Sequence, residues 1–351
     1  MAIGHRIQAD KLKTFINQLC QAAGTPSDIA EVVSRTLVNA DLKGHTSHGV
    51  LRIPGYIEGI EQKTLIPDVK PEILRQTPST ALVDAHYGWG HYAAQWSMDL
   101  AMEKAQATGM GAVSLTRHHH TGRLGEYVEQ AAHRGFIGMV TVGWGGQKTG
   151  RGTPYGGSAC ALAPNPIAIG VPSGDDRPFI SDFATTMFSD SKLNIFRMKG
   201  MKLPPGCILD KHGQPSVEPG DFFDGGTHIV FGGYKGYAFS LLTCLLGALT
   251  GVFEPDTWHI GGIFVQAIDV SAFQPLEAYQ QNVSGFLNGI RSVPPAPGFS
   301  EVLIPGDLER HALLEQSVKG IELPETVVNE LRELGEKYNL PIDKDFNRSG
   351  S

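Results

Sequence analysis

The segment Gly44–Tyr56 holds the residues best suited to do chemistry. It reads Gly-His-Thr-Ser-His-Gly-Val-Leu-Arg-Ile-Pro-Gly-Tyr and brings the imidazole of His48 close to the guanidinium of Arg52. If the chain turns helically after Gly49, the two side chains share one face, because they stand four residues apart. A histidine can exchange a proton near neutral pH, and an arginine can hold a carboxylate through two hydrogen bonds. Spacing alone also allows a purely structural pair, which is the more frequent case.

Two helices are predicted to position this segment. Apolar spacing predicts the first over residues 9–23, ending at Gly24. The second is expected to begin with Thr25 as its N-cap, followed by Pro26, and to end near Gly44. A third helix is predicted over residues 50–61. The His48 segment should therefore lie at the end of a rigid element.

Strands and helices alternate after about residue 66, which is typical of an α/β domain. Strands are predicted over 80–84, 111–115, 137–142 and 260–270, and helices over 93–108, 123–134, 237–250 and 324–338. A strand and turn are expected over residues 301–307. The predicted organisation is a helical lobe over 1–75, a cofactor-binding α/β domain over 76–305, and a helical segment over 306–345 that packs on the first lobe.

The composition fits a globular enzyme and argues against nucleic-acid binding. A net charge of -7 is spread along the sequence, without a basic run that could neutralise phosphates. The 4 cysteines form no CxxC pair, which indicates neither a disulfide framework nor a zinc ribbon and favours a cytoplasmic location. No signal peptide is expected, and the apolar run 237–253 predicts a buried helix, because small and polar residues interrupt it.

Two glycine-rich segments were candidates for binding phosphate. Residues 143–152 match neither GxGxxG nor a Walker A loop, so a flexible loop is the simpler interpretation. Residues 231–236 lead into an apolar helix and carry Lys235, which would suit an anion at a helix N-terminus. An ordinary helix start with a solvated lysine fits the same pattern.

Metal and serine-hydrolase chemistry have little support in the sequence. The run His118-His119-His120 has no HExxH or carboxylate partner, and adjacent histidines point in different directions. A GxSxG motif is absent. No metal is therefore expected.

Seven segments, in order along the chain, together resemble one enzyme family. They are Ser47–Arg52, His120–Tyr127, Pro154–Gly157, Asn165–Ala168, Asp182–Thr186, Gly232–Gly236 and Pro305–Asp307. The sequence is similar to the type-2 malate/L-lactate dehydrogenase family, which includes ureidoglycolate dehydrogenase, 2,3-diketogulonate reductase, sulfolactate dehydrogenase and piperideine- and pyrroline-2-carboxylate reductases.

The resemblance implies an α/β fold that binds NAD or NADP on a largely antiparallel central sheet, without the Rossmann arrangement. It implies hydride transfer between nicotinamide and a small 2-oxo or 2-hydroxy carboxylic acid, in a homodimer whose active site lies near the interface. Reduction of a cyclic 2-imino acid is the alternative within this class. A non-catalytic small-molecule-binding protein on the same fold is the alternative from another class.

The resemblance also assigns roles to individual residues. His48 matches the proton donor and acceptor, His120 matches a second active-site histidine that some members use as the base, and Arg52 with Ser47 matches the substrate-binding pair. Matches to cofactor-binding segments are Asp182, Phe183, Ala184, Thr185, Thr186, Met187, Phe188, Tyr234, Lys235, Gly306 and Asp307.

Two segments depart from the family pattern. Thr141-Val142-Gly143 stands where Thr-Asn-Ser is frequent, and His118-His119-His120 stands where Ser-Asn-His is common. Both lie near the expected nicotinamide and substrate, so they leave the identity of the substrate open.

Overall fold

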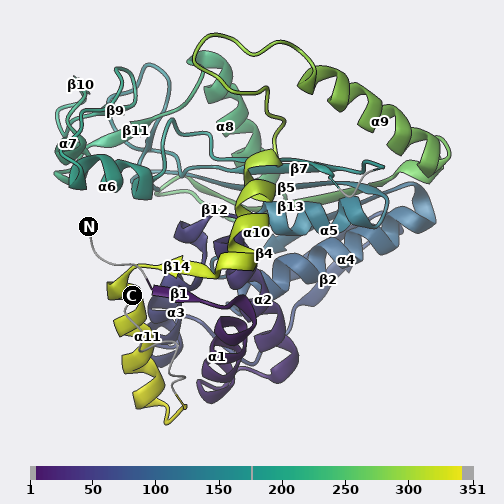
Figure 1. Cartoon of the computed structure of the whole chain (residues 1–351), viewed down its shortest axis with the longest axis horizontal. Coiled ribbons are helices and arrows are strands. Elements are labelled where there is room, and N and C mark those ends of the chain that lie inside the picture. The colour runs from purple at the N-terminus through teal and green to yellow at the C-terminus, as the bar shows by residue number, and fades with distance from the viewer. Residues whose placement is uncertain (1–4, 175–176, 342–351) are drawn as a thin grey trace.

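The structure is a computed structural model that describes residues 5–174 and 177–341 (Figure 1). Its main sheet has the strand order β2-β3-β4-β13-β5-β7-β8, with the short strand β12 paired to β13. Strands β3 and β4 pair in parallel, and the other neighbours pair antiparallel. The strands of this sheet are β2 (Glu72–Gln76), β3 (Thr80–Asp84), β4 (Met110–Thr116), β5 (Phe136–Gly145), β7 (Ile167–Val171), β8 (Phe179–Phe183), β12 (Phe253–Glu254) and β13 (His259–Asp269). The chain therefore has the α/β fold that was predicted.

Helices cover both faces of this sheet (Figure 1). They are α4 (Gly90–Thr108) and α5 (Gly125–His133) on one face, and α8 (Tyr234–Gly247) and α9 (Leu276–Arg291) on the other. One apolar core joins α4 and α5 to the strands through residues such as Met98, Tyr127 and Val265.

A second core lies in a helical lobe built from both ends of the chain. Its elements are β1 (His5–Ile7), α1 (Ala9–Ala22), α2 (Ser27–Leu42), α3 (Ile53–Glu61), α10 (Asp307–Lys319), β14 (Ile321–Leu323) and α11 (Glu325–Lys337). Strand β1 pairs antiparallel with β14, and Val328 and Leu331 of α11 share a core with Leu12 and Ile16 of α1. The C-terminal helix thus packs on the N-terminal ones, whereas the exact domain boundaries stay a prediction.

A third, small unit projects beside the main sheet (Figure 1). It contains β6 (Gly152–Thr153), α6 (Asp190–Met198), β9 (Ile208–Leu209), β10 (Pro215–Ser216), α7 (Pro219–Phe223) and β11 (Thr227–Ile229). Its own apolar cluster is centred on Leu193, Ile208 and Phe222. The sequence did not reveal this unit, because its elements are too short for hydrophobic periodicity to be visible.

Several local predictions were wrong. Helix α2 begins at Ser27 without a side-chain cap, because the Thr25 hydroxyl accepts a hydrogen bond from Trp89 Nε1 at 3.0 Å instead. Residues 301–306 form no strand, whereas the predicted turn is present at Gly306 and opens α10, which lies in the helical segment predicted over 306–345. Helix α3 begins at Ile53, because residues 50–52 form a separate 3-10 turn.

The apolar helix α8 is buried on one face only. Ser240, Thr243 and Gly247 face the sheet, whereas Leu242 and Leu245 are exposed, as is Leu249 in the 3-10 turn Ala248–Thr250 that follows. A membrane span would need a longer apolar helix than any within residues 5–174 and 177–341.

Candidate active site

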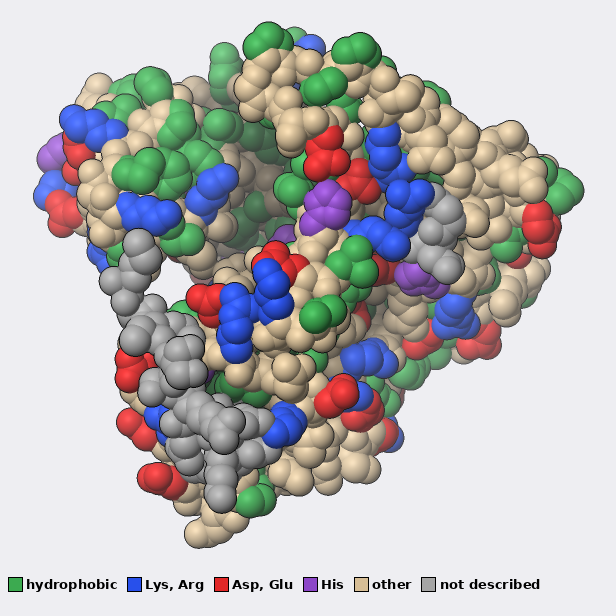
Figure 2. Space-filling view, viewed as in Figure 1, with side chains coloured by type: hydrophobic (Ala, Val, Ile, Leu, Met, Phe, Trp, Pro, Cys, Tyr) green, Lys and Arg blue, Asp and Glu red, His purple; other side chains and the backbone are tan. Residues whose placement is uncertain are grey.

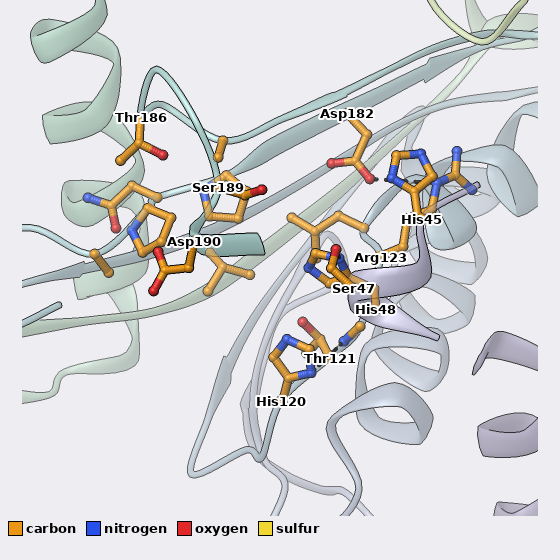
Figure 3. A pocket seen from close by; sticks show the side chains of 18 of the residues that line it. His45, Ser47, His48, His120, Thr121, Arg123, Asp182, Thr186, Ser189 and Asp190 are labelled. Carbon is orange, nitrogen blue, oxygen red and sulfur yellow. Dashed lines mark hydrogen bonds and ion pairs between the residues drawn. The ribbon is translucent and has the colours of Figure 1, made fainter. Parts of the chain in front are cut away.

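A cavity of about 710 Å³ lies between the helical lobe, the main sheet and the small unit. Figure 2 shows the hollow beside the small unit, and Figure 3 shows residues of its walls. Four stretches far apart in sequence supply most of the walls: residues 45–52, 118–124, 163–166 and 182–191. The tertiary fold therefore gathers the two predicted histidines and Arg52 around one space.

His48 reaches the cavity from a short, tightly turned segment. Two 3-10 turns, Thr46–His48 and Val50–Arg52, flank the extended Gly49, so no regular helix carries the pair of residues. The Nδ1 atom of His48 lies 2.9 Å from the Ser47 hydroxyl. Burial, followed by the nearby positive charge of Arg52, lowers the pKa of His48 to about 4.

Arg52 offers a guanidinium that no carboxylate of the described residues pairs with. Its Nε donates to the carbonyl of Ser47 at 2.7 Å, and among the described residues no ion pair involves it. The side chain is exposed and lines the cavity beside His48. Its remaining N–H groups can therefore receive a carboxylate from a ligand.

His120 stacks against His48 and is held by a tyrosine. The two imidazole rings are 5.6 Å apart at an interplanar angle of 22°. Nδ1 of His120 lies 2.6 Å from the Tyr56 hydroxyl and accepts a longer contact of 3.4 Å from the Gly122 N–H. Burial and the neighbouring His91 lower the pKa of His120 to about 2. Tyr56 closes the sequence motif that carries His48, but sequence reasoning gave it no role.

The three consecutive histidines have three different environments. His118 packs on Trp144 at 5.8 Å, His119 contacts the edge of the Tyr56 ring, and His120 faces His48. Within the described ranges, no group of three His, Cys, Asp or Glu side chains is placed to hold a metal ion.

Arg123 lies where the main cavity meets a smaller one of about 140 Å³. Its side chain is 3% exposed, with Glu129 at 3.5 Å and Asp182 at 3.9 Å. Its Nε and Nη1 atoms are buried without a hydrogen bond in the described part of the chain. Burial raises the pKa of Asp182, whereas Arg123 and the Gly125 N–H oppose that shift. Arg123 is thus a buried cation that can donate further hydrogen bonds. The sequence analysis assigned it no role.

The predicted cofactor-binding residues divide into three groups. Asp182, Phe183, Ala184 and Thr186 line the main cavity, whereas Gly306 and Asp307 line the smaller one. Five lie outside both linings: Thr185, Met187, Phe188, Tyr234 and Lys235.

The residues outside the linings have contacts of their own. The Thr185 hydroxyl donates to the Pro164 carbonyl at 2.9 Å, and Phe188 packs on Phe196. Lys235 stands in the first turn of α8, after the glycine turn that the sequence predicted. Its role in cofactor binding stays a prediction.

Asp190 and His228 also line the cavity, and sequence reasoning missed both. They stand 38 positions apart, with no local motif, so only the fold brings them together. Figure 3 shows Asp190 with Thr186 and Ser189 on one side of the cavity, and Asp182 with His45 and Arg123 on the other.

Comparison with known proteins decides the family. The sequence model of the malate/L-lactate dehydrogenases matches residues 7–332. The chain belongs to the malate/L-lactate dehydrogenase family. The resemblance read from the sequence is confirmed, and membership makes the chain an oxidoreductase of a family whose chemistry implies a nicotinamide cofactor.

Several relatives in this family align over nearly their whole length. The malate/(S)-sulfolactate dehydrogenase of Methanothermus fervidus is 32% identical over 96% of this chain and 99% of that protein. The solved malate dehydrogenase of Entamoeba histolytica superposes with a TM-score of 0.90 at 26% identity, covering 97% and 99% of the two chains. The delta1-piperideine-2-carboxylate reductase of Pseudomonas syringae pvar. tomato superposes with a TM-score of 0.82 at 25% identity, covering 94% and 99%.

Proposed function

We propose that this protein is an NAD(P)-dependent dehydrogenase that interconverts a small 2-hydroxy acid and the corresponding 2-oxo acid. The observation that carries the proposal is the exposed guanidinium of Arg52, which forms no ion pair with any described residue, beside the stacked pair His48 and His120 in one cavity. Malate, lactate and sulfolactate, which name several relatives, all carry a hydroxyl group next to a carboxylate. A carboxylate anchor beside a proton-transfer group suits that chemistry.

The residues of the cavity fit a nicotinamide dinucleotide. A volume of about 710 Å³ falls within the range of small-molecule and cofactor sites. Nη1 and Nε of Arg123 form ion pairs with Glu129 and Asp182 but no hydrogen bond among the described residues, so they would still be able to donate to a polar group of the cofactor. Asp182, Phe183, Ala184 and Thr186 would hold one part of the cofactor, and Gly306 and Asp307 in the adjoining cavity would hold another. When bound, the nicotinamide ring supplies or accepts the hydride.

The sheet is the proposed scaffold for this cofactor. Its antiparallel neighbours and the absence of a GxGxxG turn after its described strands support a binding mode unlike the Rossmann one. Dinucleotide contacts would then come from the 182–186 segment and from α10, which the fold brings near each other at Gly306 and Ile180.

The chain's own groups would orient the substrate and move one proton. Arg52 would hold the carboxylate through two parallel hydrogen bonds, which fixes the reacting carbon against the cofactor side of the cavity. His48 would take the proton of the hydroxyl during oxidation and return it during reduction. Ser47 suits this role of His48, because its hydroxyl can either donate to or accept from Nδ1.

A panel of substrates tests the proposal. Absorbance of NADH and of NADPH at a fixed enzyme concentration would be followed with pyruvate, oxaloacetate, branched 2-oxo acids and the cyclic imine pyrroline-2-carboxylate. We expect turnover of at least one 2-oxo acid with one of the two cofactors. If no 2-oxo acid is reduced by either cofactor, the proposal is wrong. Turnover of the cyclic imine alone would favour the second candidate, reduction of a 2-imino acid, which the solved piperideine-2-carboxylate reductase supports.

A further inference from the structure

A carboxylate and a buried imidazole form a polar pair on the cavity wall, on a different element from His48 and Arg52. Asp190 begins α6 in the small unit, and His228 lies on β11. Oδ1 of Asp190 is 2.6 Å from Nε2 of His228. Both residues line the cavity, together with the hydroxyl-bearing Ser189 and Ser191.

The pair presents a fixed negative charge to whatever enters the cavity. The His228 side chain is 1% exposed, whereas that of Asp190 is 57% exposed, so the imidazole is anchored and the carboxylate remains accessible. The hydrogen bond from His228 lowers the pKa of Asp190 and so keeps it ionised at neutral pH. An ionised carboxylate only accepts hydrogen bonds, so Nε2 of His228 is the donor.

Few groups of the protein compete for this carboxylate. Among the described residues, Arg151 is the cation near Asp190, with its Nη1 atom 4.0 Å from Oδ2, and its guanidinium is stacked 3.6 Å from the centre of the Phe222 ring. Arg151 also donates to the carbonyl of Phe222, which holds it on the small unit. The contact between Arg151 and Oδ2 of Asp190 is too long for a hydrogen bond, so the exposed carboxylate, which lines the cavity, keeps accepting capacity.

We propose that Asp190, positioned by His228, selects the end of the substrate that is remote from the carboxylate held by Arg52. This inference rests on the proposed function. The selected group is a hydrogen-bond donor, such as a hydroxyl, because an ionised carboxylate accepts from it. A second carboxylate at that end is disfavoured, because like charges repel at close range in a partly enclosed site.

The first step of the test measures selectivity in the wild-type protein. Terminally hydroxylated 2-oxo acids of three to six carbons would each be paired with the n-alkyl 2-oxo acid that has CH3 in place of OH. Hydroxypyruvate and 2-oxobutanoate form the first pair. We expect the hydroxylated acid to have the higher kcat/KM, by about 10- to 100-fold at the chain length that reaches Asp190, which is the size of one hydrogen bond to a charged group.

The second step removes the negative charge of Asp190 while keeping the shape of its side chain. Asp190→Asn should reduce that preference to within a few-fold and should raise kcat/KM for oxaloacetate by about 10-fold. His228→Leu should relax the preference as well, whereas His228→Gln should retain it, because its amide can replace the donor of Nε2. The matched control is Asp224→Asn, which removes an exposed carboxylate paired with Lys211 in the same unit, outside the cavity lining.

Three results would overturn the inference. One is a wild-type protein that reduces 2-oxo acids with no preference for a hydroxylated acid at any length. Another is a preference that survives Asp190→Asn. The third is an Asp190→Asn variant that changes the Kd for NADH or NADPH, measured by fluorescence titration, and leaves substrate selectivity unchanged, because Asp190 would then serve the cofactor.

A failure of the proposed function would look different. If the wild type reduces none of the acids, calorimetric titration of the protein with the same pairs of acids tests separately whether Asp190 binds the terminal hydroxyl. Tighter binding of the hydroxylated acid that is lost in Asp190→Asn would support the subsite, and equal affinities would overturn it.

Discussion

At the scale of single residues, two stacked imidazoles compete for one proton. Burial lowers the pKa of His48 to about 4 and that of His120 to about 2, so both are neutral at pH 7. His48 is favoured as the base during oxidation, because it stands four residues from the substrate anchor Arg52 and the Ser47 hydroxyl engages its Nδ1, which leaves Nε2 for the substrate. His120, held at Nδ1 by Tyr56, would then orient the substrate oxygen.

This ordering predicts different losses for the two histidines. His48→Ala should lower kcat by about 10²- to 10⁴-fold, the usual contribution of a general base, with little change in NADH affinity. His120→Ala should act mainly through substrate KM. The measurements are steady-state kinetics from pH 5 to 9 and a fluorescence titration of NADH. If His120→Ala lost more kcat than His48→Ala and its kcat no longer depended on pH, His120 would be the general base instead of His48.

Arg52 can be tested by a change that keeps its charge. Arg52→Lys replaces a planar fork with a point charge, so KM for the 2-oxo acid should rise by about 10-fold or more while NADH affinity stays constant. Arg134→Lys is the matched control, because Arg134, at the end of α5, is exposed and paired with Asp99 of α4. An unchanged KM in Arg52→Lys would contradict a carboxylate clamp.

At the scale of elements, the contact between α2 and the His48 segment depends on one glycine. Asp41 is buried in α2, and its Oδ2 accepts the backbone N–H of Val50 at 2.8 Å. A Cβ at Gly49 would lie 1.9 Å from Oδ1 of Asp41. Burial raises the pKa of Asp41 to about 7, and its hydrogen bond from the Val50 N–H holds the carboxyl against the segment. Gly49 therefore lets the segment approach α2 closely enough to place His48.

Gly49→Ala should consequently damage both stability and turnover. We expect the free energy of unfolding to fall by about 2 kcal/mol or more, as for other overpacked sites, and kcat to fall with it. Gly55→Ala in α3 is the control, because no atom lies within 4 Å of the added Cβ, and helical propensity predicts a gain of about 0.5–1 kcal/mol. Urea unfolding of both variants measures the difference. Equal stability of the two variants would contradict this account, because the His48 segment would then accommodate the added methyl group without cost.

At the scale of the whole molecule, neutral buried histidines link folding to pH. Burial lowers the pKa values of His48, His91, His118 and His120 to about 4, 3, 4 and 2, from an ordinary value of 6.5. As the pH falls below 6.5, the unfolded chain binds protons that the folded chain refuses. The stability contributed by these groups is therefore complete above pH 6.5 and is lost progressively as the pH falls toward 4.

Urea unfolding at pH 7.5, 6 and 5 should show this loss. His91→Leu should remove one of the groups that bind a proton only in the unfolded chain, because both ring nitrogens of His91 are buried without partners in the described structure. The slope of the free energy of unfolding with pH should then fall by about 1.4 kcal/mol per pH unit. His212→Leu, at an exposed turn, should leave the slope unchanged. A stability that is constant between pH 7.5 and 5 would contradict this account.

The exposed face of α8 suggests how two copies would meet. Leu242 and Leu245 of α8 are 46% and 63% exposed, and Leu249 in the 3-10 turn that follows is 57% exposed, whereas the opposite face of α8 packs on β5 and β13. We propose that this face forms the homodimer interface expected from the sequence, near the cavity to which Val142 and Trp144 of β5 contribute. Leu245→Lys should shift the protein from dimer to monomer in light scattering coupled to size-exclusion chromatography. Leu74→Lys, at an isolated exposed leucine of β2, should not, and a wild-type monomer would contradict the proposal.

The sequence by itself determined the family, the α/β class and the elements with strong periodicity. The helices around residues 9–22 and 27–42 and the central strands follow from hydrophobic spacing, because that signal is local. His48, Arg52 and His120 were identified from short segments in which residue type and order carry the chemistry. The strand expected at 301–307 and the cap expected at Thr25 failed, because tertiary contacts at Gly306 and Trp89 outweigh local preference.

Only the tertiary structure decided which distant residues share the cavity. Arg123 became a candidate site residue only because the fold buries it between two cavities. Asp190 and His228 are 38 positions apart in sequence and come into contact through the packing of the small unit. Hydrogen bonds and charges act over a few ångströms in space, and separation along the chain does not measure that distance. The same packing lowers the pKa values of His48 and His120, because desolvation depends on what surrounds a ring after the chain has folded.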